Sequence, residues 1–357
     1  MLRDSVFGSL LGTALGDSLG LPLENLSAER AKRLFPPPLR HRFLFGGGMV
    51  SDDTEHAVLT ALALARSGRN IEAFTGNLGW SLRFWVLCIP AGIGWATLRS
   101  LVKLWLGWSP ANSGVFSAGN GPAMRSPVIG AAFPDPSEAA IRRDFVRAAT
   151  RITHSDPRAE QGAQIAALAA SSAAQAGRPE DGPKQFFDLV PEALPDLSPE
   201  WKKLLDAARI SADAGTTTAG FAAAQGWNRG VSGFILHTIS AVIHAWHRSP
   251  GNLREALEDI IAAGGDTDTT AAILGGIIGA GLPPAAFPQD LTDSFRDWPW
   301  SVNLFRNCGE AIRAALNPAT TALPPVPIIF WPAVLLRNIG FAAIILAHGL
   351  RRLLPPY

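Results

Sequence analysis

The chain of 357 residues is long enough for one large domain or two smaller ones, and its 47% hydrophobic content can fill a sizeable core. Its 31 Lys and Arg residues nearly balance 30 Asp and Glu residues, which excludes a general attraction to nucleic acid or anionic membranes beyond local patches. Cys88 and Cys308 lie far apart among apolar neighbours, which predicts reduced core thiols. Because the N-terminus also lacks the pattern of a secretory signal, we expect a cytoplasmic protein.

Most of the chain has the apolar spacing of α-helices. Apolar residues recur three and four positions apart, as in residues 58–64, while β-branched runs are short, so we predict an all-α fold. In the first predicted helix, glycine occupies every fourth position, at Gly8, Gly12, Gly16 and Gly20. Each helical glycine costs about 1 kcal/mol relative to alanine. The stripe therefore indicates close backbone packing or a tight approach to a ligand.

A single acidic residue, Glu24, follows this first helix. Glycines and Pro22 surround it in residues 12–24, and we expect them to hold the segment rigidly. A lone loop carboxylate is usually solvated. Beside a metal ion, however, Glu24 could position water or accept a proton.

Two further segments place carboxylates beside hydroxyls directly after glycines. Residues 51–54 read SDDT after three glycines, and residues 266–269 read DTDT after two. Both precede an apolar helical run, so we predict that both lie at helix N-termini, where free amides and the helix dipole favour negative charge. Each segment alone could be an ordinary helix cap.

Together the two segments supply more negative charge than two helix ends can use. A cap needs one short polar side chain, whereas here Asp52, Asp53, Asp266 and Asp268 are all present. Carboxylate and hydroxyl oxygens suit the hard ions Mg²⁺, Mn²⁺ and Ca²⁺, and no zinc-type His and Cys set accompanies them. We therefore predict a cation site, with two ions if the two helix ends face each other.

Two later segments bear on domain organisation. Residues 172–200 concentrate turn formers and charges, which predicts a surface connection or insertion within one domain. Residues 323–357 are strongly apolar but are divided by Arg337 and Asn338. This tail could be a packed or partner-docking segment, an interfacial membrane anchor, or a membrane span. We predict a main domain at residues 1–320 and an apolar tail at 321–357.

Five motifs in this order resemble the set found in the ADP-ribosylglycohydrolase family, which includes the enzymes that reactivate ADP-ribosylated dinitrogenase reductase. The motifs are residues 16–24 (GDSLGLPLE), 51–54 (SDDT), 119–125 (GNGPAMR), 153–157 (THSDP) and 264–269 (GGDTDT). The resemblance spans roughly residues 5 to 285. It implies a compact orthogonal multi-helix bundle and an enzyme that uses two metal ions.

By position, the resemblance assigns a metal site and a catalytic group. The implied ligands of two Mg²⁺ ions, with Mn²⁺ possible, are Ser51, Asp52, Asp53, Asp266, Asp268 and Thr269. The implied catalytic residues are Glu24, Asp52 and Asp268, and Glu24 would lie at the edge of the metal site that binds the attacking water. The family usually has threonine where this chain has Ser51, but a serine hydroxyl offers the same oxygen. Asp17 is expected to brace the opening loop.

The resemblance also assigns residues that contact ADP-ribose. The loop that cradles the diphosphate and distal ribose would contain Asn120, Gly121, Pro122, Ala123, Met124 and Arg125. Glycine there permits close backbone approach, and amide donors suit phosphate oxygens. His154 resembles the ligand-contacting histidine of the family, and Phe234 lies near the position of an aromatic residue that contacts the sugar or adenine. A core role is an open alternative for both.

The implied activity is hydrolysis of the bond at ribose C1, which releases ADP-ribose from a protein or small molecule. Two alternatives stay open, a metal-dependent phosphohydrolase of ADP-ribose-like diphosphates and a non-catalytic ADP-ribose-binding or structural protein of the same fold. The sequence does not distinguish arginine, serine, a base or an acetyl group as the acceptor. We expect the acceptor-side rim in residues 84–97 or after Ala170.

Overall fold

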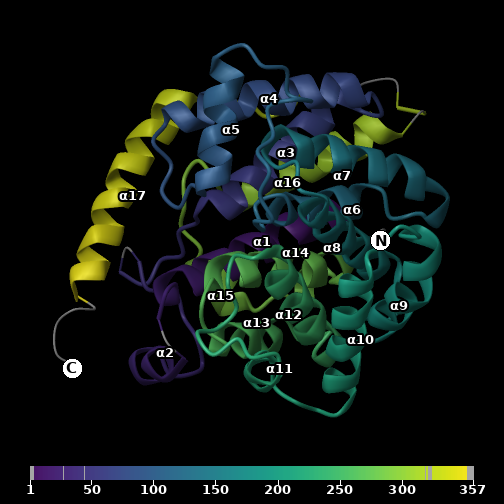
Figure 1. The fold of residues 1–357 in the computed structure, drawn as a ribbon. Helices are drawn as coiled ribbons and strands as arrows, with labels where there is room; N and C mark the ends of the chain where they lie inside the picture. The colour runs from purple at the N-terminus through teal and green to yellow at the C-terminus, as the bar shows by residue number, and fades with distance from the viewer. Residues whose placement is uncertain (1–3, 27, 44, 318, 321–323, 352–357) are drawn as a thin grey trace.

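The computed structural model describes residues 4–26, 28–43, 45–317, 319–320 and 324–351. Within these residues the chain forms α-helices and short 3-10 helices with no extended strand, and a few isolated β-bridges join loops (Figure 1). The helices are α1 (Ser5–Gly20), α2 (Ala28–Leu34), α3 (Asp52–Ser67), α4 (Ile71–Leu87), α5 (Trp95–Trp105), α6 (Ser126–Ala132), α7 (Ala139–Thr153), α8 (Pro157–Gln175), α9 (Asp181–Ala193), α10 (Pro199–Asp213), α11 (Thr218–Ala224), α12 (Ile235–Arg248), α13 (Leu253–Ala262), α14 (Thr267–Gly281), α15 (Gln289–Ser294), α16 (Val302–Leu316) and α17 (Trp331–Arg351). The predicted all-α fold is confirmed.

The glycine stripe of α1 packs directly on α14 at the centre of the molecule. A Cβ added to Gly12 would lie 2.0 Å from the carbonyl oxygen of Gly275, and one added to Gly20 would lie 2.3 Å from that of Thr267. Every residue of α1 after Ser5 is buried. The stripe therefore serves close backbone packing. Because the C-terminus of α1 meets the N-terminus of α14, this packing brings the segment after α1 beside the acidic segment that begins α14.

We expect Gly12→Ala to lower the free energy of unfolding by about 3 kcal/mol or more, since the added methyl group would force the two buried helices apart. Gly76→Ala is the matched control, because no atom lies within 4 Å of a Cβ at this position in α4. The control should be neutral or stabilising by up to about 1 kcal/mol. Denaturant unfolding measures both values, and similar stabilities for the two variants would contradict the close packing.

The prediction for residues 172–200 is wrong in its centre. Helix α8 continues to Gln175, and residues 181–193 form α9, which packs on α8. Phe186 of α9 is fully buried and contacts the ring of Trp246, with centroids 5.7 Å apart. Pro183 lies in the first turn, where a missing amide costs little, whereas Pro191 lies inside the helix near its end and removes one helical hydrogen bond. Only the short connections on either side of α9 are loops.

Two helices reach the length and hydropathy of a membrane span among the described residues. The first, Ser5–Leu23, is buried from Val6 onward and contains the central helix of the core. Residues Trp331–Arg351 form α17. Its most apolar stretch has a mean hydropathy of 1.7, but only 22% of that stretch is buried inside the protein. Helix α17 lies along one edge of the molecule (Figure 1). The two cysteines are buried and unpaired, as predicted.

Candidate active site

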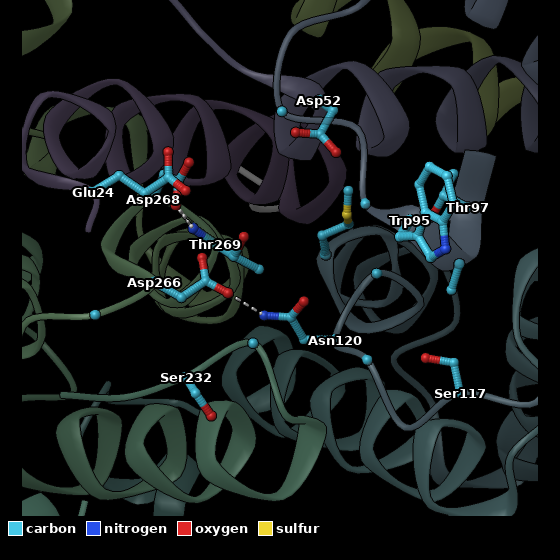
Figure 2. Close-up of a pocket in the computed structure, with 18 of the residues that line it drawn as sticks. Glu24, Asp52, Trp95, Thr97, Ser117, Asn120, Ser232, Asp266, Asp268 and Thr269 are labelled. Atoms are coloured by element: carbon cyan, nitrogen blue, oxygen red, sulfur yellow. Dashed lines mark hydrogen bonds between the residues drawn. The ribbon is translucent and has the colours of Figure 1, made fainter. Parts of the chain in front are cut away.

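A cavity of about 550 Å³ lies where the N-terminus of α14 faces the start of α5 and the loop at residues 117–121. This volume is in the range of ligand sites in enzymes. Figure 2 shows acidic side chains on one side of the cavity, and Trp95, Thr97 and Ser117 on the other. The predicted site residues that line it are Glu24, Asp52, Asn120, Gly121, Met124, His154, Asp266, Asp268 and Thr269.

Asp17 fixes the N-terminus of α3 from the neighbouring helix α1. Its carboxylate accepts hydrogen bonds from the amide of Ser51 (2.9 Å) and from the amide and hydroxyl of Thr54 (3.1 and 2.6 Å). Burial raises the pKa of Asp17 to about 6, although these hydrogen bonds act in the opposite direction. Asp17 therefore positions the first acidic segment, and its side chain is occupied in doing so.

The first acidic segment begins α3 beneath the cavity. Ser51 is the N-cap, and its hydroxyl accepts from the amide of Asp53 at 3.3 Å. The Oδ2 atom of Asp53 accepts from the hydroxyls of Ser51 (3.2 Å) and Thr269 (3.1 Å). The second contact joins α3 to α14, so the two acidic helix ends face each other. The buried Oδ1 atom of Asp53 has no hydrogen-bond partner among the described residues.

The second acidic segment begins α14 at the cavity wall. Asp266 occupies the N-cap position without capping the helix, and its Oδ2 atom accepts from Nδ2 of Asn120 at 2.8 Å (Figure 2). Asn120 also donates to the hydroxyl of Thr238 at 3.0 Å. The Oδ1 atom of Asp268 accepts from the amide of Thr269 at 2.9 Å. Asn120 thus links the predicted ligand loop to the predicted metal ligands.

The clustered carboxylates repel one another in a poorly solvated place. Burial raises the pKa of Asp52, Asp53 and Asp268 well above the usual value, and neighbouring carboxylates raise each further. For Asp268 these neighbours include Glu24 and Asp266. Ionising the whole cluster is therefore unfavourable without an added positive charge.

The donor set fits hard divalent cations. Carboxylate and hydroxyl oxygens surround the facing helix ends, and the unpartnered Oδ1 of Asp53 has an unused acceptor site. Within the described part of the chain, however, no three His, Cys, Asp or Glu side chains already have metal-binding geometry.

The predicted ligand loop only partly faces the cavity. Asn120, Gly121 and Met124 line it, and a Cβ added to Gly121 would lie 3.1 Å from the His154 ring. Pro122 does not line it and precedes a 3-10 helix, Ala123–Arg125, that turns the chain into the core. Ala123 at the start of this helix is fully buried.

Arg125 lies behind the cavity rather than in it. Its buried guanidinium donates to the carbonyl of Ala149 (3.0 Å) and to the hydroxyl of Thr153, and it lies 2.9 Å from Nδ1 of His56. Thr153 in turn contacts Nδ1 of His154 at 2.9 Å. Burial, followed by the charge of Arg125, lowers the pKa of His154 to about 3. Arg125 therefore supports a neutral His154 at the cavity wall and does not itself line the cavity.

Phe234 also lies outside the cavity lining. It immediately precedes α12, and the guanidinium of Arg158 lies 5.6 Å from its ring centroid. Its ring also meets His237 edge to face at 5.2 Å. The neighbouring residues Ser232 and Gly233 line the cavity instead.

Several lining residues carried no motif that would have identified them. They are Trp95, Thr97, Ser117, Arg229 and Ser232. Of residues 84–97, where we expect the acceptor-side rim, the part at 92–97 lines the cavity, and Gly92 and Gly94 accompany Trp95 there. The alternative, the connection after Ala170, does not line the cavity, since α8 continues to Gln175 and residues 229–233 form the opposite wall.

The sequence is similar to those of known proteins. The family model described as ADP-ribosylglycohydrolase matches residues 1–318. An uncharacterized protein of Archaeoglobus fulgidus is 26% identical over 296 residues, which cover 81% of this chain and 90% of that protein. ADP-ribosyl-(dinitrogen reductase) glycohydrolase of Rhodospirillum rubrum is 28% identical over 165 residues, 44% of this chain and about half (53%) of that relative.

A solved structure titled ADP-ribosylglycohydrolase-related protein complex has the same fold. Its TM-score is 0.62 at 22% sequence identity, and the match covers 88% of this chain and 97% of that one. At this identity the likeness establishes architecture only, and it confirms the predicted bundle type. Because the family model covers most of the sequence, the chain belongs to the ADP-ribosylglycohydrolase family.

Proposed function

We propose that the protein hydrolyses the bond between ribose C1 of ADP-ribose and an acceptor, and so reverses ADP-ribosylation. The main support is the meeting of two acidic helix ends at one cavity, joined by the contact between Thr269 and Asp53. Cleavage at an anomeric carbon develops positive charge on the sugar, which nearby carboxylates stabilise. The activity in the name of the Rhodospirillum rubrum relative points the same way.

We further propose two Mg²⁺ ions, or Mn²⁺, as the cofactor. The residues that would hold them are Ser51, Asp52, Asp53, Asp266, Asp268 and Thr269. Such ions supply Lewis acidity and a bound water of lowered pKa. Support comes from the excess of buried carboxylates and from the unpartnered Oδ1 of Asp53.

Side chains around these carboxylates would transfer the proton and orient the ligand. Glu24 lines the cavity beside Asp268, where a carboxylate can take a proton from attacking water. The side-chain Nδ2 of Asn120 orients Asp266, and the side-chain Oδ1 can accept a hydrogen bond from the ligand. Neutral His154 can offer a hydrogen bond without adding positive charge near the developing oxocarbenium ion. We propose a cytoplasmic setting, in keeping with two buried, unpaired thiols.

The test is hydrolysis of arginine-linked and serine-linked ADP-ribosyl peptides and of O-acetyl-ADP-ribose, each with Mg²⁺ and with chelator. We expect Mg²⁺-dependent release of intact ADP-ribose from at least one substrate, which would also identify the acceptor. Release of AMP would instead indicate phosphohydrolase chemistry. Binding of ADP-ribose without turnover of any substrate would indicate a binding protein and contradict the proposal.

A further inference from the structure

Helix α17 has one face on the protein and one apolar face exposed. Val334, Asn338 and Phe341 are buried against the body of the molecule. On the other side Leu336 and Leu346 are 71% and 67% exposed. Ile339 and Leu350 are exposed with them, and the spacing of the four places them along one stripe. An apolar stripe of this length is unusual on a surface that faces only water.

A second group of exposed apolar side chains lies on the second half of α4, at the two ends of α5 and in the residues that follow α5. Its main residues, each at least 42% exposed, are Trp80, Phe84, Trp95, Trp105, Leu106 and Trp108. Four of these are tryptophans. Tryptophan is enriched where one end of a side chain meets an apolar phase and the other end stays hydrated.

Stacked aromatic rings join the two patches. Phe84 of α4 lies between Trp80 and Trp331, with ring centroids 6.2 and 6.0 Å away and near-parallel planes. Trp331 is the first residue of α17, and the exposed side chains of Ile328 and Phe330 precede it. We call the α4–α5 patch, this junction and the α17 stripe together the apolar face. Figure 1 shows α4, α5 and α17 along adjoining edges of the molecule.

The segments that form the apolar face contain basic residues but no acidic ones. Residues 73–134 and 311–357 contain no Asp or Glu. Arg83, Arg99 and Lys103 lie in the α4–α5 region, and Arg351 ends α17. The guanidinium of Arg83 lies 4.7 Å from the ring centroid of Trp80, within the patch itself. Exposed tryptophan and leucine with basic residues alone match the interface of an anionic lipid bilayer.

We propose that the apolar face binds the surface of an anionic lipid bilayer, with α17 lying in the plane of the interface. A spanning arrangement conflicts with the contacts of α17. Arg337 pairs with buried Glu55 and Asp297, and Asn338 donates to the carbonyl of Cys88 at 3.0 Å. Crossing the bilayer would break these contacts, whereas lying on it leaves them intact.

The cavity opens beside the apolar face. Trp95 is the first residue of α5, is 73% exposed, and also lines the cavity. A ligand that enters past Trp95 would therefore approach along the bilayer. This consequence for substrate access rests on the proposed function, but membrane binding itself does not.

The test is co-sedimentation of the full chain with vesicles of phosphatidylcholine alone or of phosphatidylcholine and phosphatidylglycerol (3:1). We expect at least about tenfold tighter binding to the anionic vesicles, because several basic residues lie near the surface. Leu346→Gln/Leu350→Gln and, separately, Leu106→Gln should each weaken binding severalfold to tenfold. Ile210→Gln on α10, which is also exposed (64%), is the matched control and should bind like the wild type.

Thermal unfolding and circular dichroism of every variant should match the wild type, since all the substituted side chains are exposed. Absence of vesicle binding, or equal weakening by Ile210→Gln, would overturn the proposal. So would a wild-type dimer in solution that Leu346→Gln/Leu350→Gln dissociates, because a second copy would then cover the face. No substrate is used, so the outcome is independent of the hydrolase assignment.

Discussion

Metal-free Asp268→Asn protein is expected to unfold at a higher temperature than the metal-free wild type. Burial and the charges of Glu24, Asp266 and Asp53 raise the pKa of Asp268, so its ionised form is disfavoured in the folded protein. The amide removes this charge but keeps an oxygen that can accept from the amide of Thr269. Its Nδ2 can also donate to the neighbouring Asp266. The gain in the free energy of unfolding should be about 1 kcal/mol or more at pH 8.

The pH dependence of this gain has a defined sign. A folded-state pKa above the unfolded value means that the cost of ionisation is absent well below pH 3.8 and grows as pH rises through the folded pKa. The advantage of Asp268→Asn should therefore be absent in acid, grow as pH rises above the unfolded value near 3.8, and level off above the folded pKa. Thermal unfolding of both proteins in chelator across this pH range measures it.

Added Mg²⁺ should reverse the order of stability. Neutralising the carboxylate cluster should raise the melting temperature of the wild type, with little effect on Asp268→Asn. Hydrolase activity should fall by more than the ~10–100-fold typical of losing an outer-shell partner. Asp206→Asn is the control, because its side chain is 65% exposed on α10. Equal Mg²⁺ stabilisation of Asp268→Asn and the wild type would contradict a metal site at this cluster.

The sequence predicted the local parts of the site better than their arrangement. Apolar spacing and the glycine-Asp patterns are local signals, and they correctly placed Asp52 and Asp268 in the first turns of two helices. The glycine stripe at Gly12 left two explanations open, because the partner glycine Gly275 lies more than 260 positions away. Only the folded chain shows that this contact brings the segment after α1 beside the acidic N-terminus of α14.

Side-chain direction explains where the motif-based assignments diverged from the structure. Residues 119–125 form a contiguous motif, yet a 3-10 turn at Ala123–Arg125 directs Arg125 away from the cavity and into the core. A motif fixes the order of residues but not which of them a turn buries. Conversely, Trp95 reaches the cavity from the first residue of α5 and Arg229 reaches it from a turn. Neither position has a recognisable sequence pattern, because the conformation of the connecting loops depends on the surrounding helices.

The interpretation of Arg337 changed most between sequence and structure. In the sequence it interrupts an apolar tail and weakens the case for a membrane span. In the structure its side chain is 6% exposed and forms ion pairs with Glu55 of α3 (3.3 Å) and with Asp297. The partners lie up to 282 positions away, so no local pattern could reveal them. Arg337 and Asp297 also bind the carbonyl and amide of Val50, next to the first acidic segment.

Arg337→Met is therefore expected to lower the free energy of unfolding by about 3–5 kcal/mol, the usual effect of removing one partner from a buried ion pair. Methionine keeps much of the aliphatic volume, so the loss reports mainly on charge. Glu55 and Asp297, whose side chains are 2% and 1% exposed, would be left without this cation. Arg313→Met is the control, because that arginine is 56% exposed and its pairing with Asp4 should contribute no more than about 1 kcal/mol.

The stability deficit of Arg337→Met should grow with pH. Burial raises the pKa of Glu55 to about 7 even though Arg337 lowers it, so removing the arginine raises that pKa further. A raised folded-state pKa makes the folded state less stable as pH rises from the unfolded value near 4.5 through the folded value. The deficit should therefore be smaller at pH 5 than at pH 8, as measured by denaturant unfolding. A pH-independent deficit would mean that lost packing against Phe341, 4.2 Å from the guanidinium, dominates instead.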